Sequence, residues 1–246
     1  MSDMFSRTRM LVGDDGIKRL KNAAVAVFGI GGVGSYVVEA LARCGVGRFL
    51  LVDKDRVCAS NINRQIIATN KTIGRLKVEV MRERILDINP GAAIEISPIF
   101  YNNQTADDFD LSNYSYVVDA IDTVKSKLTL IERAKALNVP IISSMGAGNR
   151  LDPGCFEVTD IYQTSYCPLA KIMRRELRRR GIENLKVVYS KEIIPIKNID
   201  DDVQNTGKRQ VGSISFVPSV AGLMIAGELV RDIINGEMRA SRSTKC

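Results

Sequence analysis

The chain has 246 residues, 45% of them hydrophobic, and a net charge of +7, which is the composition of an ordinary globular protein. It has no histidine and no C-x-x-C pair among its five cysteines, which excludes the usual zinc ligand sets and the commonest general base. A polar N-terminus argues against a signal peptide, and Pro218 and Gly222 interrupt the longest apolar run, so we expect no membrane span. A cytoplasmic protein with reduced thiols is the simplest expectation.

Short apolar segments alternate with segments of helical periodicity through the first 146 residues. The expected strands are 23–29, 48–53, 93–98, 114–122 and 139–146, and the expected helices are 35–45, 75–89 and 125–138. This alternation predicts an α/β fold of the Rossmann-like type, with a mostly parallel sheet and helices on both faces.

The second half of the chain is less regular. Segment 156–181 predicts a strand, a loop and a basic helix, 185–190 predicts another strand, and 217–236 predicts a closing helix that ends at Gly236. The polar, glycine-containing segment 195–213 is expected to be a mobile loop or a lid. We expect a single domain over 1–246, with a nucleotide core at about 20–145 and a substrate-facing part at about 146–246.

A glycine-rich turn follows the first expected strand and opens the first expected helix. Gly29, Gly31, Gly32 and Gly34 would let the backbone approach a phosphate, and the helix N-terminus would supply amide donors. Asp53 ends the next strand, where an acid commonly accepts hydrogen bonds from ribose hydroxyls. The turn therefore predicts a nucleotide site, and it does not by itself separate a dinucleotide from ATP.

The residues just downstream favour a triphosphate. Asp55, Asn61, Arg64 and Gln65 follow the second strand closely, and Lys77 follows on a helix. Arginine can bind phosphate oxygens through two hydrogen bonds and lysine supplies a compact charge, whereas a nicotinamide enzyme has no evident use for this cluster.

A further acid, Asp122, ends the strand expected at 114–122. Ligands collect at the carboxyl edge of open α/β sheets, so Asp122 is placed to hold Mg²⁺ on the phosphates. Taken singly, Arg64 and Lys77 can also be surface charges, and Asp122 can be a turn residue.

Together, Gly29–Gly34, 53–65, Lys77 and 119–123 resemble the ubiquitin-activating-like adenylating enzymes, which include the activators of the molybdopterin and thiamine sulfur carriers. The resemblance covers about 5–145 and implies a ubiquitin-activating-enzyme-like fold, binding of ATP and Mg²⁺, adenylation of a carboxylate and release of pyrophosphate. It implies ribose binding by Asp53, a phosphate turn at Gly32 and a metal on Asp122. The phosphate contacts would come from Asn61, Arg64, Gln65 and Lys77.

The same resemblance implies a homodimer in which Arg7, in the segment FSRTRML, enters the partner's site and takes part in catalysis with Arg64, Lys77 and Asp122. The chain departs from the carrier-activating members because it lacks their paired C-x-x-C ligands. It also shows no obvious cysteine for thioester transfer. Cys167 is the best candidate, and the alternative interpretation is a small residue at the start of a helix.

Segment 144–181 closely resembles the bacterial tRNA threonylcarbamoyladenosine dehydratases. That resemblance implies ATP-dependent activation of the carboxylate of threonylcarbamoyladenosine in tRNA, followed by cyclisation of the side chain. The basic helix 168–180 suits such a substrate, because cationic side chains neutralise backbone phosphates. The residues predicted to bind tRNA are Lys171, Arg174, Arg175, Arg178 and Arg179.

Three alternatives stay open on the sequence alone. An adenylyltransferase would activate the C-terminus of a ubiquitin-like sulfur-carrier protein and would work with a sulfur-transfer partner. A nicotinamide oxidoreductase would prefer NAD to ATP. A non-catalytic nucleotide-binding scaffold would bind ATP without turnover.

Overall fold

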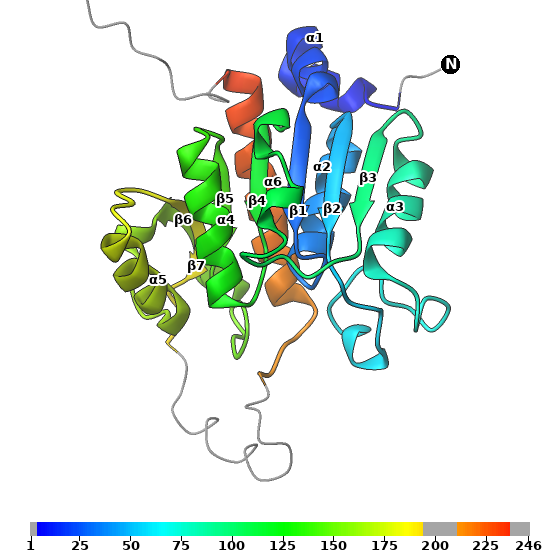
Figure 1. The fold of residues 1–246 in the computed structure, drawn as a ribbon. Coiled ribbons are helices and arrows are strands. Elements are labelled where there is room, and N and C mark those ends of the chain that lie inside the picture. The colour runs from blue at the N-terminus through cyan, green and yellow to red at the C-terminus, as the bar shows by residue number, and fades with distance from the viewer. Residues whose placement is uncertain (1–3, 194–210, 237–246) are drawn as a thin grey trace, which may run out of the picture.

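The structure is a computed structural model that describes residues 4–193 and 211–236 (Figure 1). The segment 195–213, predicted as a loop or a lid, lies outside the described residues except for 211–213. Among the residues described, no helix is long and apolar enough to cross a membrane.

Within 4–193 and 211–236, seven strands form one sheet in the order β3-β2-β1-β4-β5-β7-β6. All neighbouring pairs are parallel except β6 and β7, so the expectation of a mostly parallel sheet is confirmed. The strands are β1 (Ala24–Phe28), β2 (Arg48–Val52), β3 (Ala93–Ser97), β4 (Tyr116–Asp119), β5 (Ile141–Ser144), β6 (Phe156–Asp160) and β7 (Lys186–Ser190). The central strands β1, β4 and β5 are buried along their whole length, which explains their unbroken apolar sequences.

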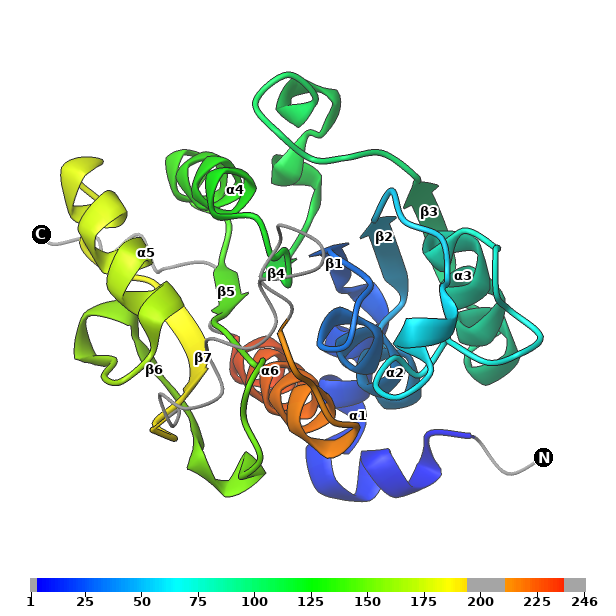
Figure 2. The ribbon, with the colours of Figure 1, turned by 90° about the horizontal axis from the view of Figure 1, so that it is seen from below.

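Helices cover both faces of the sheet (Figure 2). Apolar residues of α2, α3 and α6 form one core with one face, and those of α4 and α5 form a second core with the other. The helices are α1 (Ser6–Asn22), α2 (Gly34–Cys44), α3 (Lys77–Ile88), α4 (Val124–Ala136), α5 (Pro168–Arg179) and α6 (Phe216–Asn235). Short 3-10 segments lie at η1 (Ala59–Asn61), η2 (Ala106–Asp108), η3 (Leu111–Asn113), η4 (Pro153–Cys155) and η5 (Ile161–Gln163).

The N-terminal helix α1 was not predicted from the sequence. It precedes β1, packs against α6 through buried Gly16 and Leu20, and changes direction at Gly13, which has a φ of +70°. Its first half exposes Met10 and Leu11, whose relative accessibilities are 84% and 88%. An exposed apolar pair of this kind suits a contact with another protein surface.

Candidate active site

A cavity of about 410 Å³ opens at the carboxyl ends of β1, β2 and β4, a size typical of small-molecule sites. The loops after these strands meet here because parallel neighbours end at the same edge of the sheet. Most of the predicted nucleotide-binding residues line this one cavity: Gly31, Gly32, Asp53, Asp55, Asn61, Arg64, Gln65, Lys77 and Asp122.

The glycine turn is built by a close approach of its own backbone. Gly29 has a φ of +93°, and a Cβ on Gly34 would lie 1.8 Å from the carbonyl oxygen of Gly29. Position 34 therefore excludes any side chain. Gly34 does not line the cavity, so its place in the fold is to let α2 start directly beneath the turn.

Asp53 ties the end of β2 to that turn. Its Oδ2 accepts a 2.7 Å hydrogen bond from the backbone N–H of Ile30, and its Oδ1 accepts a 2.8 Å bond from the N–H of Asp55. Burial raises the pKa of the Asp53 carboxyl, and the nearby Lys77 ammonium acts in the opposite direction. The carboxylate thus fixes the backbone of the glycine turn beside the cavity. Each of its oxygens can still accept a hydrogen bond from a ligand hydroxyl.

Lys77 is the first residue of α3 and is almost fully buried, at 5% relative accessibility. Its Nζ lies 2.9 Å from the Asp55 carboxylate and 4.0 Å from that of Asp53. An ammonium group has three N–H donors, and one of them is directed to Asp55. The pair therefore presents a positive group to the cavity at a fixed position, with donors left for a phosphate.

The turn after η1 supplies three polar side chains. Arg64 donates from Nη1 to the carbonyl of Ser60 and to the side chain of Asn63, both at 2.9 Å, which leaves other guanidinium donors for a ligand. The buried Gln65 has no partner for its Oε1, and its amide nitrogen lies beside Gly31 in the cavity wall. Asn61 accepts from the N–H of Cys58, so its side chain also shapes the loop.

Asp122 is exposed at the opposite wall of the cavity and accepts a 3.1 Å hydrogen bond from the hydroxyl of Thr123. Within the described part of the chain, no three His, Cys, Asp or Glu residues are grouped to hold a metal by themselves. Magnesium on a nucleotide needs one or two carboxylates in addition to phosphate oxygens, so this donor set fits a metal that arrives with its nucleotide.

Several cavity residues were missed by sequence reasoning. Ile99, Phe100 and Tyr101 follow β3, and Pro218 from α6 packs against Gly32. These segments lie far from the glycine turn in the sequence, and apolar loop residues carry no spacing signal. No role was predicted for the fully buried Asp119, which belongs to the motif 119–123, or for the fully buried Lys127, and both lie beneath the loop that carries Asp122. The sequence offers one signal for them, an acid at the end of an apolar strand that is followed closely by a helix.

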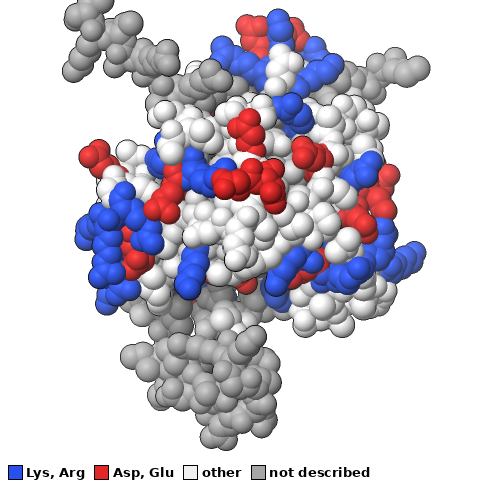
Figure 3. All heavy atoms as spheres, viewed as in Figure 1, with Lys and Arg blue, Asp and Glu red and all other residues white. Residues whose placement is uncertain are grey.

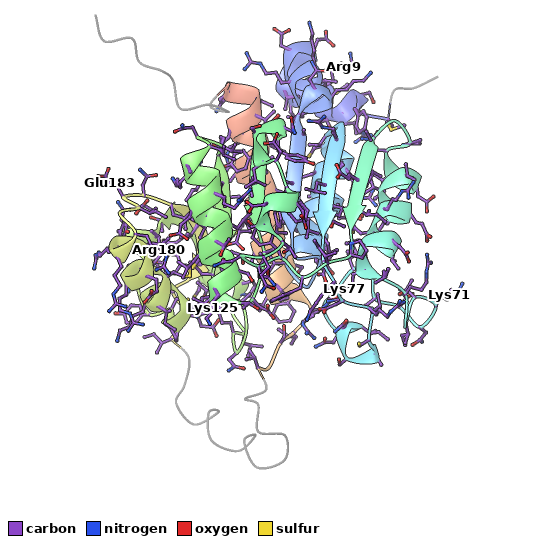
Figure 4. The ribbon with its side chains drawn as sticks, viewed as in Figure 1. Arg9, Lys71, Lys77, Lys125, Arg180 and Glu183 are labelled. Carbon is purple, nitrogen blue, oxygen red and sulfur yellow. The ribbon has the colours of Figure 1, made fainter. Side chains whose placement is uncertain are left out.

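Two groups of predicted residues lie away from the cavity. Arg7 is on α1, at the opposite end of the sheet from the cavity, so a single chain does not bring it to its own site (Figures 1 and 4). In Figure 4, Lys77 lies in the lower half of the molecule, and Arg9 marks α1 at the top. The proposed contribution of Arg7 to a partner's site stays a prediction.

The basic helix α5 lies at one flank of the molecule, where Lys and Arg gather (Figure 3). Lys171, Arg175, Arg178 and Arg179 are exposed, as a phosphate-binding surface requires. Arg174 is different, because it is half-buried and donates a 2.9 Å hydrogen bond to the carbonyl of Thr164, as well as bonding to its hydroxyl.

Neighbouring side chains partly engage the exposed arginines of α5. Arg175 and Arg179 each lie 3.2 Å from the Glu176 carboxylate, and the guanidinium of Arg178 lies 5.0 Å from the centre of the Tyr162 ring. The side chains of Arg175 and Arg179 stay about two-thirds exposed, at 65% and 66%. Lys171, Arg175, Arg178 and Arg179 therefore form the accessible basic face, and Arg174 holds the loop before the helix.

A family model described as the ThiF family matches residues 5–244, which is almost the whole chain. The chain belongs to the ThiF family. The seven-stranded fold and the glycine turn described above are therefore those of a ThiF-family protein, and the resemblance to the ubiquitin-activating-like adenylating enzymes is confirmed.

Within the ThiF family, the chain is similar to several proteins named as tRNA threonylcarbamoyladenosine dehydratases, and at lower coverage to a sulfur carrier protein adenylyltransferase of Thermus thermophilus. It is 42% identical to a Bacillus subtilis protein named tRNA threonylcarbamoyladenosine dehydratase, over 95% of this chain and 96% of that one. It is 44% identical to a Haemophilus influenzae protein of the same name, over 67% and 63% of the two chains. The Escherichia coli tRNA N6-threonylcarbamoyladenosine dehydratase, solved in complex with ATP, matches with a TM-score of 0.86 and 32% identity over 95% of each chain.

Proposed function

We propose that this protein is an ATP-dependent tRNA threonylcarbamoyladenosine dehydratase, which adenylates the carboxylate of the modified nucleoside and promotes its cyclisation. Its similarity to the Bacillus subtilis enzyme along almost the whole length of both chains supports the activity. The observation that carries the chemistry is the single cavity that joins the glycine turn to Asn61, Arg64, Gln65 and Lys77. We expect the protein to act in the cytoplasm, where its tRNA substrate is found.

The cavity accounts for the nucleotide. The turn and the N-terminus of α2 would receive phosphate oxygens, because backbone amide donors and the helix dipole favour an anion there. Asp53 would accept from the ribose, and Arg64, Gln65 and Lys77 would bind the phosphates. Magnesium, when bound, neutralises phosphate charge, and Asp122 is the residue that we expect to hold it.

The reaction then needs positioning and charge neutralisation. An oxygen of the substrate carboxylate attacks the α-phosphorus, the bond to the bridging oxygen breaks, and pyrophosphate leaves. A nucleophile in the same side chain attacks the acyl carbon and loses its proton to solvent, and AMP leaves with the former carboxylate oxygen. The nucleoside has then lost one water overall. Arg64 and Lys77 would stabilise the departing pyrophosphate, and ring closure benefits from proximity within one substrate. Because the nucleophile belongs to the substrate, the reaction requires no catalytic cysteine.

The accessible basic face of α5 is the surface that we assign to tRNA. Lys171, Arg175, Arg178 and Arg179 would contact backbone phosphates, which position the substrate but carry no sequence information. A homodimer completed by Arg7 is also part of this proposal, supported by the exposed apolar residues of α1. A sulfur-transfer partner stays a prediction of the sequence resemblance.

The deciding experiment is mass spectrometry of tRNA nucleosides after incubation with the protein and ATP. We expect threonylcarbamoyladenosine to be replaced by a product lighter by one water, with stoichiometric formation of AMP and pyrophosphate. Arg64→Ala should abolish the conversion, whereas Arg82→Ala, an exposed arginine of α3 outside the cavity, should not. Adenylation of the C-terminus of a small carrier protein, with no change in tRNA, would favour the sulfur-carrier alternative instead.

A further inference from the structure

Two charged side chains are completely buried below the wall of the nucleotide cavity. Asp119 ends β4 and Lys127 lies on α4, both at 0% relative accessibility, and the Nζ of Lys127 is 3.0 Å from the Oδ2 of Asp119. Ser143 on β5 donates a 2.6 Å hydrogen bond to the same oxygen. The ion pair thus lies between three elements of the fold and does not line the cavity itself.

The pair binds the backbone of one residue, Ile121, on both sides. The Oδ1 of Asp119 accepts from the N–H of Ile121 at 3.2 Å, and the Nζ of Lys127 donates to the carbonyl of Ile121 at 3.0 Å. Ile121 lines the cavity, as do its neighbours Ala120 and Asp122. The N–H and the carbonyl of this residue are therefore both fixed by one buried pair.

The same loop also borders the glycine turn. The N–H of Ala120 donates to the carbonyl of Phe28 at 2.8 Å, and the carbonyl of Ala120 lies where a Cβ on Gly29 would approach it to 2.5 Å. A displacement of the Ala120–Asp122 segment would therefore move both the Asp122 carboxylate and the floor beneath the phosphate turn. The buried Asp119–Lys127 pair is therefore connected, through the Ala120–Asp122 segment, to the wall that carries Asp122 and to the glycine turn.

The buried Asp119–Lys127 ion pair is not explained by a contribution to the stability of the fold. Removing two charges from water costs several kcal/mol per ion, and replacing a buried ion pair by apolar residues of similar volume is often neutral or stabilising. An apolar pair of similar volume between β4, α4 and β5 would avoid this desolvation cost, but it would leave Ile121 without its two side-chain partners. The ion pair and an apolar replacement would therefore differ mainly in how firmly they fix the Ala120–Asp122 segment.

We propose that Asp119 and Lys127 are positioning residues, which fix the Ile121–Asp122 backbone at the cavity wall and thereby set the affinity for ATP with Mg²⁺. This inference rests on the proposed function, because it takes ATP as the ligand of the cavity. It assigns no contact with the nucleotide to either residue. Their effect passes through Ile121 and Asp122.

The test compares calorimetric titrations of ATP, with and without Mg²⁺, for the parent and three variants. In the double variant Asp119→Leu/Lys127→Met, the charges are removed together, so no unpaired charge stays buried. The melting temperature should fall only modestly, because Ile121 and Ser143 lose hydrogen-bond partners and leucine is larger than aspartate. Its dissociation constant for ATP with Mg²⁺ should rise about tenfold, which is about 1.4 kcal/mol. Without Mg²⁺ the loss should be smaller, because Asp122 then has no metal to hold.

Ser143→Ala is the matched control. It removes a hydrogen bond from the same carboxylate but keeps both bonds to Ile121, so its ATP affinity should stay within about twofold of the parent value even if its melting temperature falls. A folded double variant that binds ATP with Mg²⁺ as tightly as the parent would overturn the inference.

The double variant Asp119→Asn/Lys127→Gln decides the question if the first double variant does not fold, because it also removes both charges together. The glutamine side chain is one atom shorter than that of lysine, so it should lose the bond to the Ile121 carbonyl and weaken ATP binding. Unchanged affinity in this variant would contradict the inference. A parent protein that binds no ATP would contradict the proposed function itself, and the two failures are therefore distinguishable.

Discussion

Single residues in the cavity and directly beneath it act through backbone geometry as much as through charge. Asp53 binds the N–H of Ile30 and so supports the glycine turn from the neighbouring strand. Gly34 leaves room for the carbonyl oxygen of Gly29, which a side chain would displace. The turn is thus stabilised from two sides before any nucleotide binds, and a preorganised site loses less entropy on binding.

A substitution at Gly34 should disrupt this geometry. Gly34→Ala places a Cβ within 1.8 Å of the carbonyl oxygen of Gly29, so the backbone must shift, at a cost of about 1 to 3 kcal/mol in the free energy of unfolding. ATP affinity should fall at the same time because the turn opens. Gly91→Ala, whose Cβ would have no neighbour closer than 3.8 Å, is the control. Denaturant unfolding and ATP titration measure both effects, and parent-like values for Gly34→Ala would refute this account of the turn.

At the scale of the elements, α5 carries two kinds of arginine. Its apolar face, formed by Ala170, Met173 and Leu177, packs into the core next to β7. Arg174 lies beside that face and bonds to Thr164, whereas the remaining basic side chains lie on the exposed side. The helix therefore combines a structural contact with a surface charge, and the two are separable by mutation.

The separation gives a paired prediction for α5. The triple variant Lys171→Ala/Arg175→Ala/Arg179→Ala should keep its melting temperature and its ATP affinity, but it should bind tRNA more weakly. The dependence of log K on log salt should become less steep, by roughly one unit for each phosphate that the variant can no longer neutralise. Arg174→Ala should instead lower the melting temperature, because the Thr164 carbonyl loses its donor. If the triple variant binds tRNA like the parent over a range of salt concentrations, tRNA binds elsewhere.

At the scale of the whole molecule, α6 packs against elements from both the first and the second half of the chain. It packs on α1 and α2 and also contacts β5, β6 and β7 of the sheet. Lys186 on β7 lies 2.8 Å from both the Glu228 and the Asp232 carboxylates, and Tyr116 on β4 donates to Asp232 at 2.7 Å. This cluster fixes the helix to strands that are distant from one another in the chain.

The cluster predicts a dependence of stability on pH. Burial acts to raise the pKa of the Glu228 carboxyl, but hydrogen bonds from Lys186 and Arg231 outweigh burial and lower it below the usual 4.5. A depressed carboxyl pKa stabilises the fold above about 4.5, and the contribution is lost as the pH falls through the folded-state pKa. Glu228→Gln should therefore melt below the parent at pH 7, by about 2 to 4 °C for each kcal/mol lost, and the gap should close in acid.

Glu183→Gln is the control for this pH series. Glu183 is exposed and makes no ion pair with any residue that the structure describes. At every pH, the melting temperature of Glu183→Gln should therefore equal that of the parent. A gap for Glu228→Gln that stays constant between pH 7 and pH 3 would show that the carboxylate charge is not the cause.

The oligomer is the largest scale at which the sequence makes a prediction. If Arg7 completes the partner's site, Arg7→Ala and Asp122→Asn should each be inactive alone. Their mixture should recover about a quarter of the parent activity, because half of randomly mixed dimers contain one intact site out of two. Tagged subunits and an exchange assay confirm that mixed dimers form. Exchange without recovery would show that Arg7 does not act across an interface.

The sequence by itself determined the local features of this protein. The apolar runs and glycine signals predicted the strands and helices of the nucleotide core, and Gly236 ends α6 in the left-handed conformation as expected. Periodicity and turn chemistry act over a few residues, so they can be read directly from the chain. The same holds for the motif at 53–65, whose residues follow one strand and therefore reach the cavity together.

Only the tertiary structure decided which residues meet across long separations. Asp119, Lys127 and Ser143 become a buried cluster because β4, α4 and β5 pack together, and Lys186 joins Asp232 through the same kind of contact. The burial of Arg174 against Thr164 likewise depends on how α5 docks, and charge alone gave no sign of it. A side chain's burial and partners are set by other segments of the chain, whereas local spacing sets only the element that carries it.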